Sequence, residues 1–224
     1  MKTTADGMFV LIEASKLSPE DAFLQYEPKT MMQELFKKRL VSAIKRGVKD
    51  FYRPRIDPSF TEDGTGICYK SGRKPAVGKS YNCWVDVAKN FNPDRKSRLG
   101  KRSEYVAFLG VLIKTLVAKG WSVDEAWLTV CNDSKKLGHY RNSKNAKDDF
   151  ELTGSREIGG FFDLANTYKV LADDEGMGAF WLAGGTFWNI SYIYPLAYLD
   201  QYDYCNCNLD YSVGWLVLES STDH

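Results

Sequence analysis

The chain has 224 residues, of which 44% are hydrophobic and 14% aromatic, and its formal net charge is +1 at pH 7. This length suits a domain with a sizeable core, and the composition excludes an intrinsically disordered chain. No apolar run approaches the roughly 18 residues that a membrane-spanning helix needs, and the patch MFVLI is too short for a signal-peptide core. We therefore expect synthesis in the cytoplasm without membrane insertion, so that any display on a phage particle or a cell surface would use another route.

The first predicted helix spans residues 29–50, where apolar side chains recur near a 3.6-residue period and Gly47 lies close to the end. The next segment, residues 51–84, is rich in proline, glycine and serine. This composition is typical of loops and short strands rather than of helices.

Two further helices are predicted in the middle of the chain. Residues 102–120 carry apolar side chains around most of the circumference, which indicates a buried helix, and Ser103 is the expected N-cap. Residues 121–134 begin the third helix, because Ser122 and Glu125 have the spacing of a capping box.

The last part of the chain has a different sequence pattern, with short apolar runs in place of long helical periods. Residues 159–176 suggest a short helix or a structured turn, whereas residues 179–185 form a compact apolar strand that two glycines should stop. Residues 212–220 predict one apolar strand at the end, and residues 186–211 between them show no helical period. Helices followed by strands indicate an α+β fold.

Charge is distributed unevenly along the chain. Residues 170–224 contain no lysine or arginine but eight acidic side chains, so the preceding part is basic. Its lysines are spread out rather than gathered in one tract, which favours a solvated basic face over a nucleic-acid site. The acidic end would repel a phosphate backbone. We therefore expect that nucleic acid is not the partner.

The cysteines do not suggest a disulfide framework or a zinc site. There are five of them, at irregular spacing: Cys68, Cys83, Cys131, Cys205 and Cys207. A zinc site would need a second close pair or nearby histidines, and the two histidines of the chain are His139 and the terminal His224. Free thiols are expected, and Cys131 is expected to be a buried structural thiol.

No catalytic motif is recognisable. The chain lacks a nucleophile elbow, a phosphate-binding loop, a metalloprotease helix motif and a glycine-rich dinucleotide motif. His139 lies in a polar connection and is more typical of a surface side chain than of a general base. Residues 173–175 are acidic and precede a glycine, which favours a solvated turn over a cation site. The sequence therefore predicts no catalytic residue, no metal site and no cofactor.

Tyrosine is concentrated in residues 186–211, which hold six of the 13 tyrosines of the chain. Asparagine, serine and aspartate fill the gaps between them. This mixture resembles a binding surface, because tyrosine offers a large amphipathic contact area at low entropic cost. Alternating tyrosine and polar residues would also suit β-strands with an aromatic core face. The alternation places Tyr202, Tyr204, Asn206 and Asn208 on one face of a strand. Two asparagines do not suit a core face, so a displayed surface is favoured.

Five segments resemble the variable proteins of diversity-generating retroelements. They are FWLAGG (180–185), YPLAYL (194–199), SVGWLVLE (212–219) and the upstream stretches 118–151 and 152–175. The order and spacing of the three C-terminal pieces carry the resemblance, which covers about the last half of the chain.

The resemblance implies a C-type lectin fold of the variant shared with formylglycine-generating enzymes. It divides the chain into an N-terminal helical segment, 1–55, and a C-type lectin-like domain, 56–224, with a variable region at about 186–211. In this family a reverse transcriptase errs at template adenines, and diversified AAY codons cannot become Lys, Glu, Gln, Met or Trp. Of these five types, residues 186–211 contain Trp188 and Gln201 alone.

Within this frame, some residues are expected to be scaffold and others to contact ligand. The expected scaffold positions are Gly184, Gly185, Pro195, Leu196, Ala197, Ser212, Val213, Gly214 and Trp215. The expected ligand contacts are Phe187, Trp188, Asn189, Ser191, Tyr192, Tyr194, Tyr198, Asp200, Tyr202, Asp203, Tyr204, Cys205, Asn206, Asn208, Asp210 and Tyr211. The family would make the chain a phage or bacterial ligand-binding protein for a protein or cell-surface receptor, and it leaves the ligand and any oligomer open.

Two other classes remain as alternatives. An enzyme related to formylglycine-generating enzymes would use the reactive pair Cys205 and Cys207. A weaker alternative is a nucleic-acid module that uses the basic residues between 29 and 102.

Overall fold

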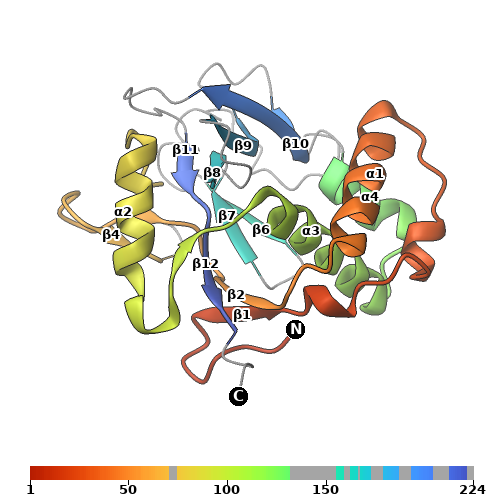
Figure 1. Ribbon diagram of the computed structural model, residues 1–224, viewed down its shortest axis with the longest axis horizontal. Helices are drawn as coiled ribbons and strands as arrows, with labels where there is room; N and C mark the ends of the chain where they lie inside the picture. Colours follow the sequence, from red (N-terminus) through yellow and green to blue (C-terminus); the bar gives the residue numbers. More distant parts are fainter. Residues whose placement is uncertain are drawn as a thin grey trace.

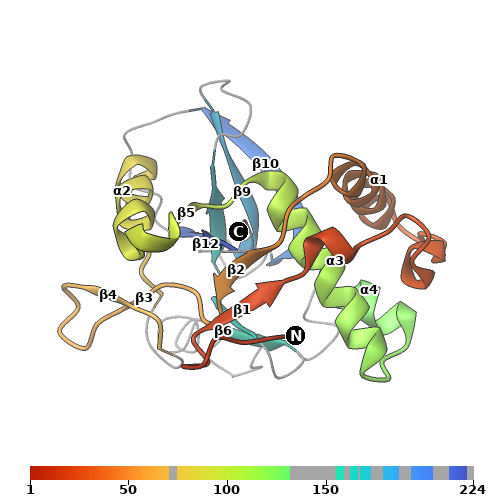
Figure 2. The same ribbon diagram turned by 60° about the horizontal axis from the view of Figure 1, so that its bottom comes forward.

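The computed structural model describes residues 1–70, 75–131, 155–158, 162–165, 167–172, 179–186, 193–203 and 212–220. This part of the chain forms a mixed α+β architecture (Figures 1 and 2). Its α-helices are α1 (Met31–Lys45), α2 (Tyr81–Phe91), α3 (Arg102–Ala118) and α4 (Val123–Cys131), and its 3-10 helices are η1 (Ala14–Lys16), η2 (Ala22–Gln25) and η3 (Pro93–Arg95). None of the described helices combines the length and the apolar character needed to cross a membrane.

The strands form two larger sheets and two hairpins in the described residues. They are β1 (Phe9–Ile12), β2 (Phe51–Pro54), β3 (Ser59–Phe60), β4 (Ile67–Cys68), β5 (Arg98–Leu99), β6 (Ser155–Ile158), β7 (Phe162–Ala165), β8 (Tyr168–Leu171), β9 (Ala179–Thr186), β10 (Ile193–Asp203), β11 (Ser212–Gly214) and β12 (Leu216–Glu219). The first sheet has the order β1-β2-β12-β5, and the second has the order β10-β9-β8-β11. β11 pairs with β8 in parallel, whereas the remaining pairs in these two sheets are antiparallel.

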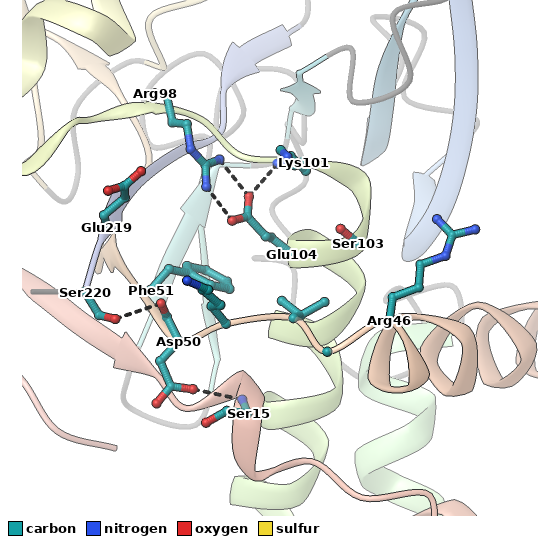
Figure 3. Close-up of a pocket in the computed structure, with 13 residues that line it drawn as sticks. Ser15, Arg46, Asp50, Phe51, Arg98, Lys101, Ser103, Glu104, Glu219 and Ser220 are labelled. Atoms are coloured by element: carbon teal, nitrogen blue, oxygen red, sulfur yellow. Dashed lines mark hydrogen bonds and ion pairs between the residues drawn. The ribbon is translucent and has the colours of Figure 1, made fainter. Parts of the chain in front are cut away.

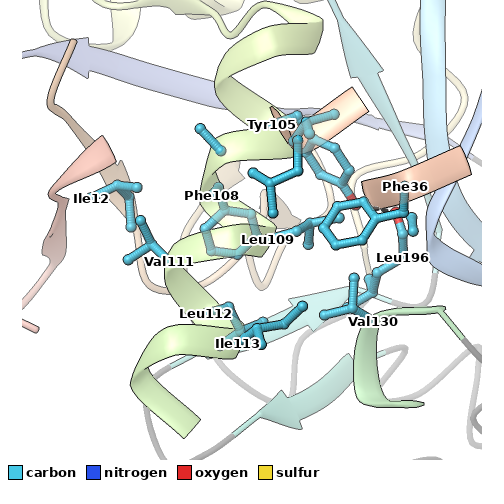
Figure 4. Close-up of a cluster of buried hydrophobic side chains, with 14 of the residues drawn as sticks. Ile12, Phe36, Tyr105, Phe108, Leu109, Val111, Leu112, Ile113, Val130 and Leu196 are labelled. Atoms are coloured by element: carbon cyan, nitrogen blue, oxygen red, sulfur yellow. Dashed lines mark hydrogen bonds between the residues drawn. The ribbon is translucent and has the colours of Figure 1, made fainter. Parts of the chain in front are cut away.

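The helices pack on two sides of the sheets. Figures 1 and 2 place α2 on one side and α1, α3 and α4 on the other. The second side holds the larger apolar cluster, which surrounds α3 and includes Ile12 of β1, Phe36 of α1, Val130 of α4 and Leu196 of β10 (Figure 4). Each buried aliphatic or aromatic side chain contributes about 1.5–3 kcal/mol through its removal from water. The core therefore joins segments from both ends of the chain.

Local signals set the starts of the helices, although α1 ends at Lys45 instead of residue 50 and the cap of α3 differs from the prediction. Thr30 caps α1 by accepting from the Gln33 N–H at 3.3 Å, and Ser122 accepts from the Glu125 N–H at 3.2 Å, as the capping box predicted. At α3 the expected N-cap Ser103 is wrong, because the Glu104 carboxylate accepts from the Lys101 N–H at 2.7 Å. That bond makes Lys101 the N-cap.

The prediction that α3 is buried is confirmed. Eleven of its 17 residues are buried, including Tyr105, Phe108 and Leu112. A Cβ on Gly110 would lie 2.7 Å from Leu40 Cδ1, so the absence of a side chain allows α1 to pack closely against α3.

One helix and several strands were not predicted. α2 lies at the end of the segment assigned to loops, although Tyr81, Trp84 and Ala88 lie on one buried face at helical spacing. The segment 1–55 contains β1 and β2 in addition to α1, and β2 pairs with the C-terminal strand β12. Strands therefore also occur before the helices along the chain.

Three predictions for the last third are corrected. The described residues within 159–176 form strands β7 and β8 instead of the short helix that was one of the two predictions, and the end of the predicted turn, 173–176, lies outside the described residues. The two glycines do not stop the apolar strand, because β9 continues through them to Thr186. The single strand at 212–220 is two strands, β11 and β12, which Trp215 separates because each pairs with a different sheet.

Candidate ligand-binding surface

The tyrosine-rich segment enters the structure on strand β10, whose buried side chains anchor it to the core. Leu196 is 3% exposed and Ala197 is 1% exposed, and Leu199 is buried as well. The Leu196 carbonyl oxygen accepts a hydrogen bond from the Tyr105 hydroxyl of α3 at 3.0 Å. This burial is consistent with the scaffold role expected for Leu196 and Ala197.

Strands β9 and β10 lie close together at Gly184. This residue has a φ of +35°, and a Cβ there would lie 2.7 Å from the Leu196 Cα atom. The register between the two strands shifts between Tyr194 and Leu199, so Leu196 lies within an irregularity of the ladder. The expected close backbone approach at a glycine is therefore confirmed for Gly184.

Beyond the anchor, β10 presents side chains to the surface. Tyr198 is half-buried against a second apolar cluster, whose buried members include Trp84 of α2 and Leu182 of β9. Its hydroxyl donates to Asp200 Oδ2 at 3.1 Å. Gln201 is exposed and lies opposite Trp181 of β9. Tyr198 and Asp200 thus combine an apolar body with polar groups that reach solvent, which suits contact with a partner.

After the tyrosine-rich segment, the chain returns to the core at Trp215. Its N–H donates to the Val170 carbonyl at 3.0 Å, and its carbonyl accepts from the Gly100 N–H at 2.9 Å. Its ring is fully buried and makes edge contacts with Phe51 and Tyr105. The prediction that Trp215 packs into the core is confirmed.

The expected ligand contacts fall into three groups. The structure describes the side chains of Tyr198 and Asp200 and brings them together, and it describes the backbone alone for Tyr194, Tyr202 and Asp203. The others lie outside the described residues: Phe187, Trp188, Asn189, Ser191, Tyr192, Tyr204, Cys205, Asn206, Asn208, Asp210 and Tyr211.

Basic side chains next to β9 come from the N-terminal helices. The Arg102 guanidinium of α3 lies 4.3 Å from the centre of the Trp181 ring. Burial, and then the positive charge of Arg102, lower the pKa of Arg39 on α1 below its usual value. The sequence analysis did not select these residues, although it showed that no basic side chain follows residue 169. Any cation beside this surface must therefore come from the earlier part of the chain.

A buried ionic cluster joins Arg53 on β2 of the first sheet to Lys169 on β8 of the second sheet. Arg53 Nη2 is 2.8 Å from Asp57 Oδ1, and Lys169 Nζ is 3.2 Å from Asp57 Oδ2, with all three side chains at most 2% exposed. The Arg53 guanidinium also lies over the rings of Phe108 and Phe162. Burial lowers the pKa of Arg53, and the charge of Asp57 opposes that effect. The enclosure of these charges indicates a structural role.

The described cysteines are free thiols. Cys68 and Cys83 are half-buried, and Cys131 is buried, which raises its pKa through loss of hydration. The expectation of a buried structural thiol at Cys131 is therefore confirmed. The pair Cys205 and Cys207, both histidines and the acidic residues 173–175 lie outside the described residues.

Comparison of the chain with protein-family models, with curated proteins and with solved structures finds no match.

Proposed function

We propose that this protein binds a protein or cell-surface ligand through the tyrosine-rich segment 186–211, on a C-type lectin fold of the formylglycine-generating-enzyme variant. In this proposal the segment is diversified by adenine-directed mutagenesis from a retroelement, and the protein is a binder rather than an enzyme. It would function on a phage particle or a bacterial surface.

The observation that carries the proposal is the division of side chains along β10. Leu196, Ala197 and Leu199 are buried, whereas Tyr198 and Asp200 are partly exposed and Gln201 is exposed. A binding surface that tolerates sequence change needs such a division, because exposed side chains contribute little to stability whereas buried ones contribute much.

Anchoring of the segment also supports the proposal. The Tyr105 hydroxyl holds the Leu196 carbonyl within the segment, and the Trp215 backbone, four residues after it, bonds to Val170 and Gly100. A segment held at fixed points loses less conformational freedom when it binds, so more of its contact energy appears as affinity.

The nucleotide sequence around the gene tests the retroelement directly. We expect a near-repeat of the 3′ end that differs at adenines and lies beside a reverse-transcriptase gene. A 3′ end that is unique in its genome would contradict the diversification mechanism.

Two matched sets of variants test the binding surface at the protein level. The first replaces Tyr192, Tyr202 and Tyr204 by other residues that NNY codons encode. We expect changes within about 0.5 kcal/mol, or about 1–2 °C in melting temperature, at each position. The control set truncates Leu196 and Leu199 to alanine, which should cost about 2–5 kcal/mol each. Equal losses in the two sets would mean that the tyrosines are core residues.

The enzyme alternative has its own test. If the protein is a binder, replacing both Cys205 and Cys207 by serine should affect ligand binding only through the expected contact of Cys205. Loss of a measurable turnover in the same double variant would favour the enzyme.

A further inference from the structure

A charged pocket lies at the junction of four elements, apart from β10. Its volume is about 560 Å³, within the range of small-molecule sites. It is lined by the end of α1, the start of β2, the start of α3 and the end of β12 (Figure 3). Phe51, which is 2% exposed, provides an apolar wall.

One ion pair in the pocket is already satisfied within the protein. Arg98 makes a two-pronged contact with Glu104, with Nη2–Oε1 at 2.6 Å and Nη1–Oε2 at 2.8 Å. Glu104 also accepts from the Lys101 N–H. Paired in this way, Arg98 and Glu104 form a rigid wall with little net charge.

Two cationic side chains at the pocket have no carboxylate partner in the described residues. Arg46 follows α1 and is exposed, and Lys101 precedes α3 and is exposed as well. Figure 3 shows Lys101 and Ser103 at the start of α3, and Arg46 at the end of α1 with its exposed side chain directed away from the Arg98–Glu104 pair. The Ser103 hydroxyl is a further donor. Lys101 carries its charge at the positive end of a helix, where cations are disfavoured. A bound anion would relieve that repulsion.

The opposite side of the pocket offers acceptors. Asp50 is held in place because its carboxylate accepts from the Ser15 N–H at 2.8 Å and its carbonyl accepts from the Ser220 hydroxyl at 3.0 Å. Glu219 lies on the same side and is half-exposed, with Lys96 Nζ 3.4 Å away. Carboxylates placed in this way can accept hydrogen bonds from hydroxyl groups.

We propose that this pocket binds the phosphate monoester of a small hydroxylated molecule. The guanidinium of Arg46, the ammonium of Lys101 and the hydroxyl of Ser103 would hold the phosphate, while Asp50 and Glu219 accept from the hydroxyls. A phosphate carries about −1.5 to −2 charges at pH 7, which matches two cations, and its three terminal oxygens match donors from three side chains. The proposal is independent of the tyrosine-rich surface.

Calorimetric titration of the full chain with glucose 6-phosphate tests the proposal. Inorganic phosphate and glucose serve as partial ligands. We expect saturable binding of glucose 6-phosphate, weaker binding of inorganic phosphate and none of glucose. Arg46→Gln and Lys101→Gln should each weaken both phosphates at least about fivefold, because each removes one charge-assisted contact.

Two further variants make the result specific. Lys38→Gln removes the same charge from the exposed face of α1 outside this pocket and should leave binding unchanged. Glu219→Gln should weaken glucose 6-phosphate but not inorganic phosphate, because its contact is with hydroxyls. Melting curves verify that each variant is folded.

Three results would overturn the proposal: no saturable binding of either phosphate, equal weakening by Lys38→Gln, or binding of succinate as tight as that of glucose 6-phosphate. The last result would indicate a carboxylate site instead.

Discussion

The Tyr105 hydroxyl donates a hydrogen bond to the carbonyl oxygen of Leu196 at 3.0 Å and so joins the first turn of α3 to the irregularity of β10. Both residues are almost completely buried. The bond gives this buried carbonyl a hydrogen-bond partner where the register of the β9–β10 ladder shifts. It therefore connects the helical core to the base of the proposed binding surface.

Tyr105→Phe removes this hydroxyl and keeps the ring contacts with Trp215 and Phe108. We expect a loss of about 1–2 kcal/mol in the free energy of unfolding, because the buried carbonyl loses its donor. Urea unfolding measures the loss. The control is Tyr198→Phe, where the hydroxyl is near solvent and the cost should be within about 0.5 kcal/mol. Equal losses in the two variants would show that the hydrogen bond to Leu196 stabilises the protein no more than the hydroxyl of Tyr198 does.

Gly184→Ala should destabilise the protein more than Gly7→Ala. Both glycines have positive φ, +35° and +68°, so both substitutions carry backbone strain of about 1–2 kcal/mol. At Gly7 no atom lies within 4 Å of the added Cβ, whereas at Gly184 the Leu196 Cα atom is 2.7 Å away. The clash should add about 1–3 kcal/mol. Melting temperatures of the two variants that fall by the same amount would contradict the close approach.

Asp57→Asn should be among the most destabilising conservative changes in the described residues. It removes the carboxylate between Arg53 and Lys169 and leaves two buried cations without that countercharge. Removing one partner of a buried ion pair costs about 3–5 kcal/mol. Denaturant unfolding measures the cost, and Asp86→Asn on the exposed face of α2 is the control, with a change within about 0.5 kcal/mol.

Asp63 should titrate with a pKa of about 2, below its ordinary value of 3.8. The Thr61 hydroxyl is the largest cause, followed by the hydroxyl and the N–H of Thr65, all of which donate to the carboxylate. Because the folded pKa is lowered, the stabilisation is complete above pH 3.8 and is lost as the pH falls through about 2.

Carboxyl NMR titration measures the pKa of Asp63. Thr61→Val should raise it towards 3.8, since the strongest donor is removed, and Thr65→Val should raise it less. A titration midpoint of 3.8 in the unaltered protein would contradict this turn geometry.

Helix prediction succeeded where the signal was local. The capping box of Ser122 and Glu125 and the all-round apolar pattern of α3 depend on residues within a few positions of one another. α2 was missed because the glycine- and proline-rich residues before it masked a buried face of Tyr81, Trp84 and Ala88.

Strand prediction failed where pairing was non-local. Four-residue strands such as β7 and β8 carry too few alternations to be distinguished from turns. The strand breaks at Trp215 because β11 pairs with β8 of one sheet, whereas β12 pairs with β2 and β5 of the other sheet. No feature within residues 212–220 indicates these different partners.

The candidate site was predictable in its anchors and not in its surroundings. Leu196, Ala197 and Trp215 were expected as anchors from the family resemblance, and all three are buried apolar residues. Arg102 beside Trp181 could not be predicted, because the two residues belong to distant segments and meet through the packing of α3 beside β9.

By itself the sequence determined the mixed α+β class, the presence of α1, α3 and α4, the buried thiol of Cys131 and the burial of Leu196, Ala197 and Trp215. These properties depend on residue type and short-range spacing. The tertiary structure alone decided the pairing of β2 with β12, the enclosed charges of Arg53, Asp57 and Lys169, and the pocket between Arg46 and Glu219. Each of these brings together groups that are far apart along the chain, and only the burial of a shared core fixes which of them meet.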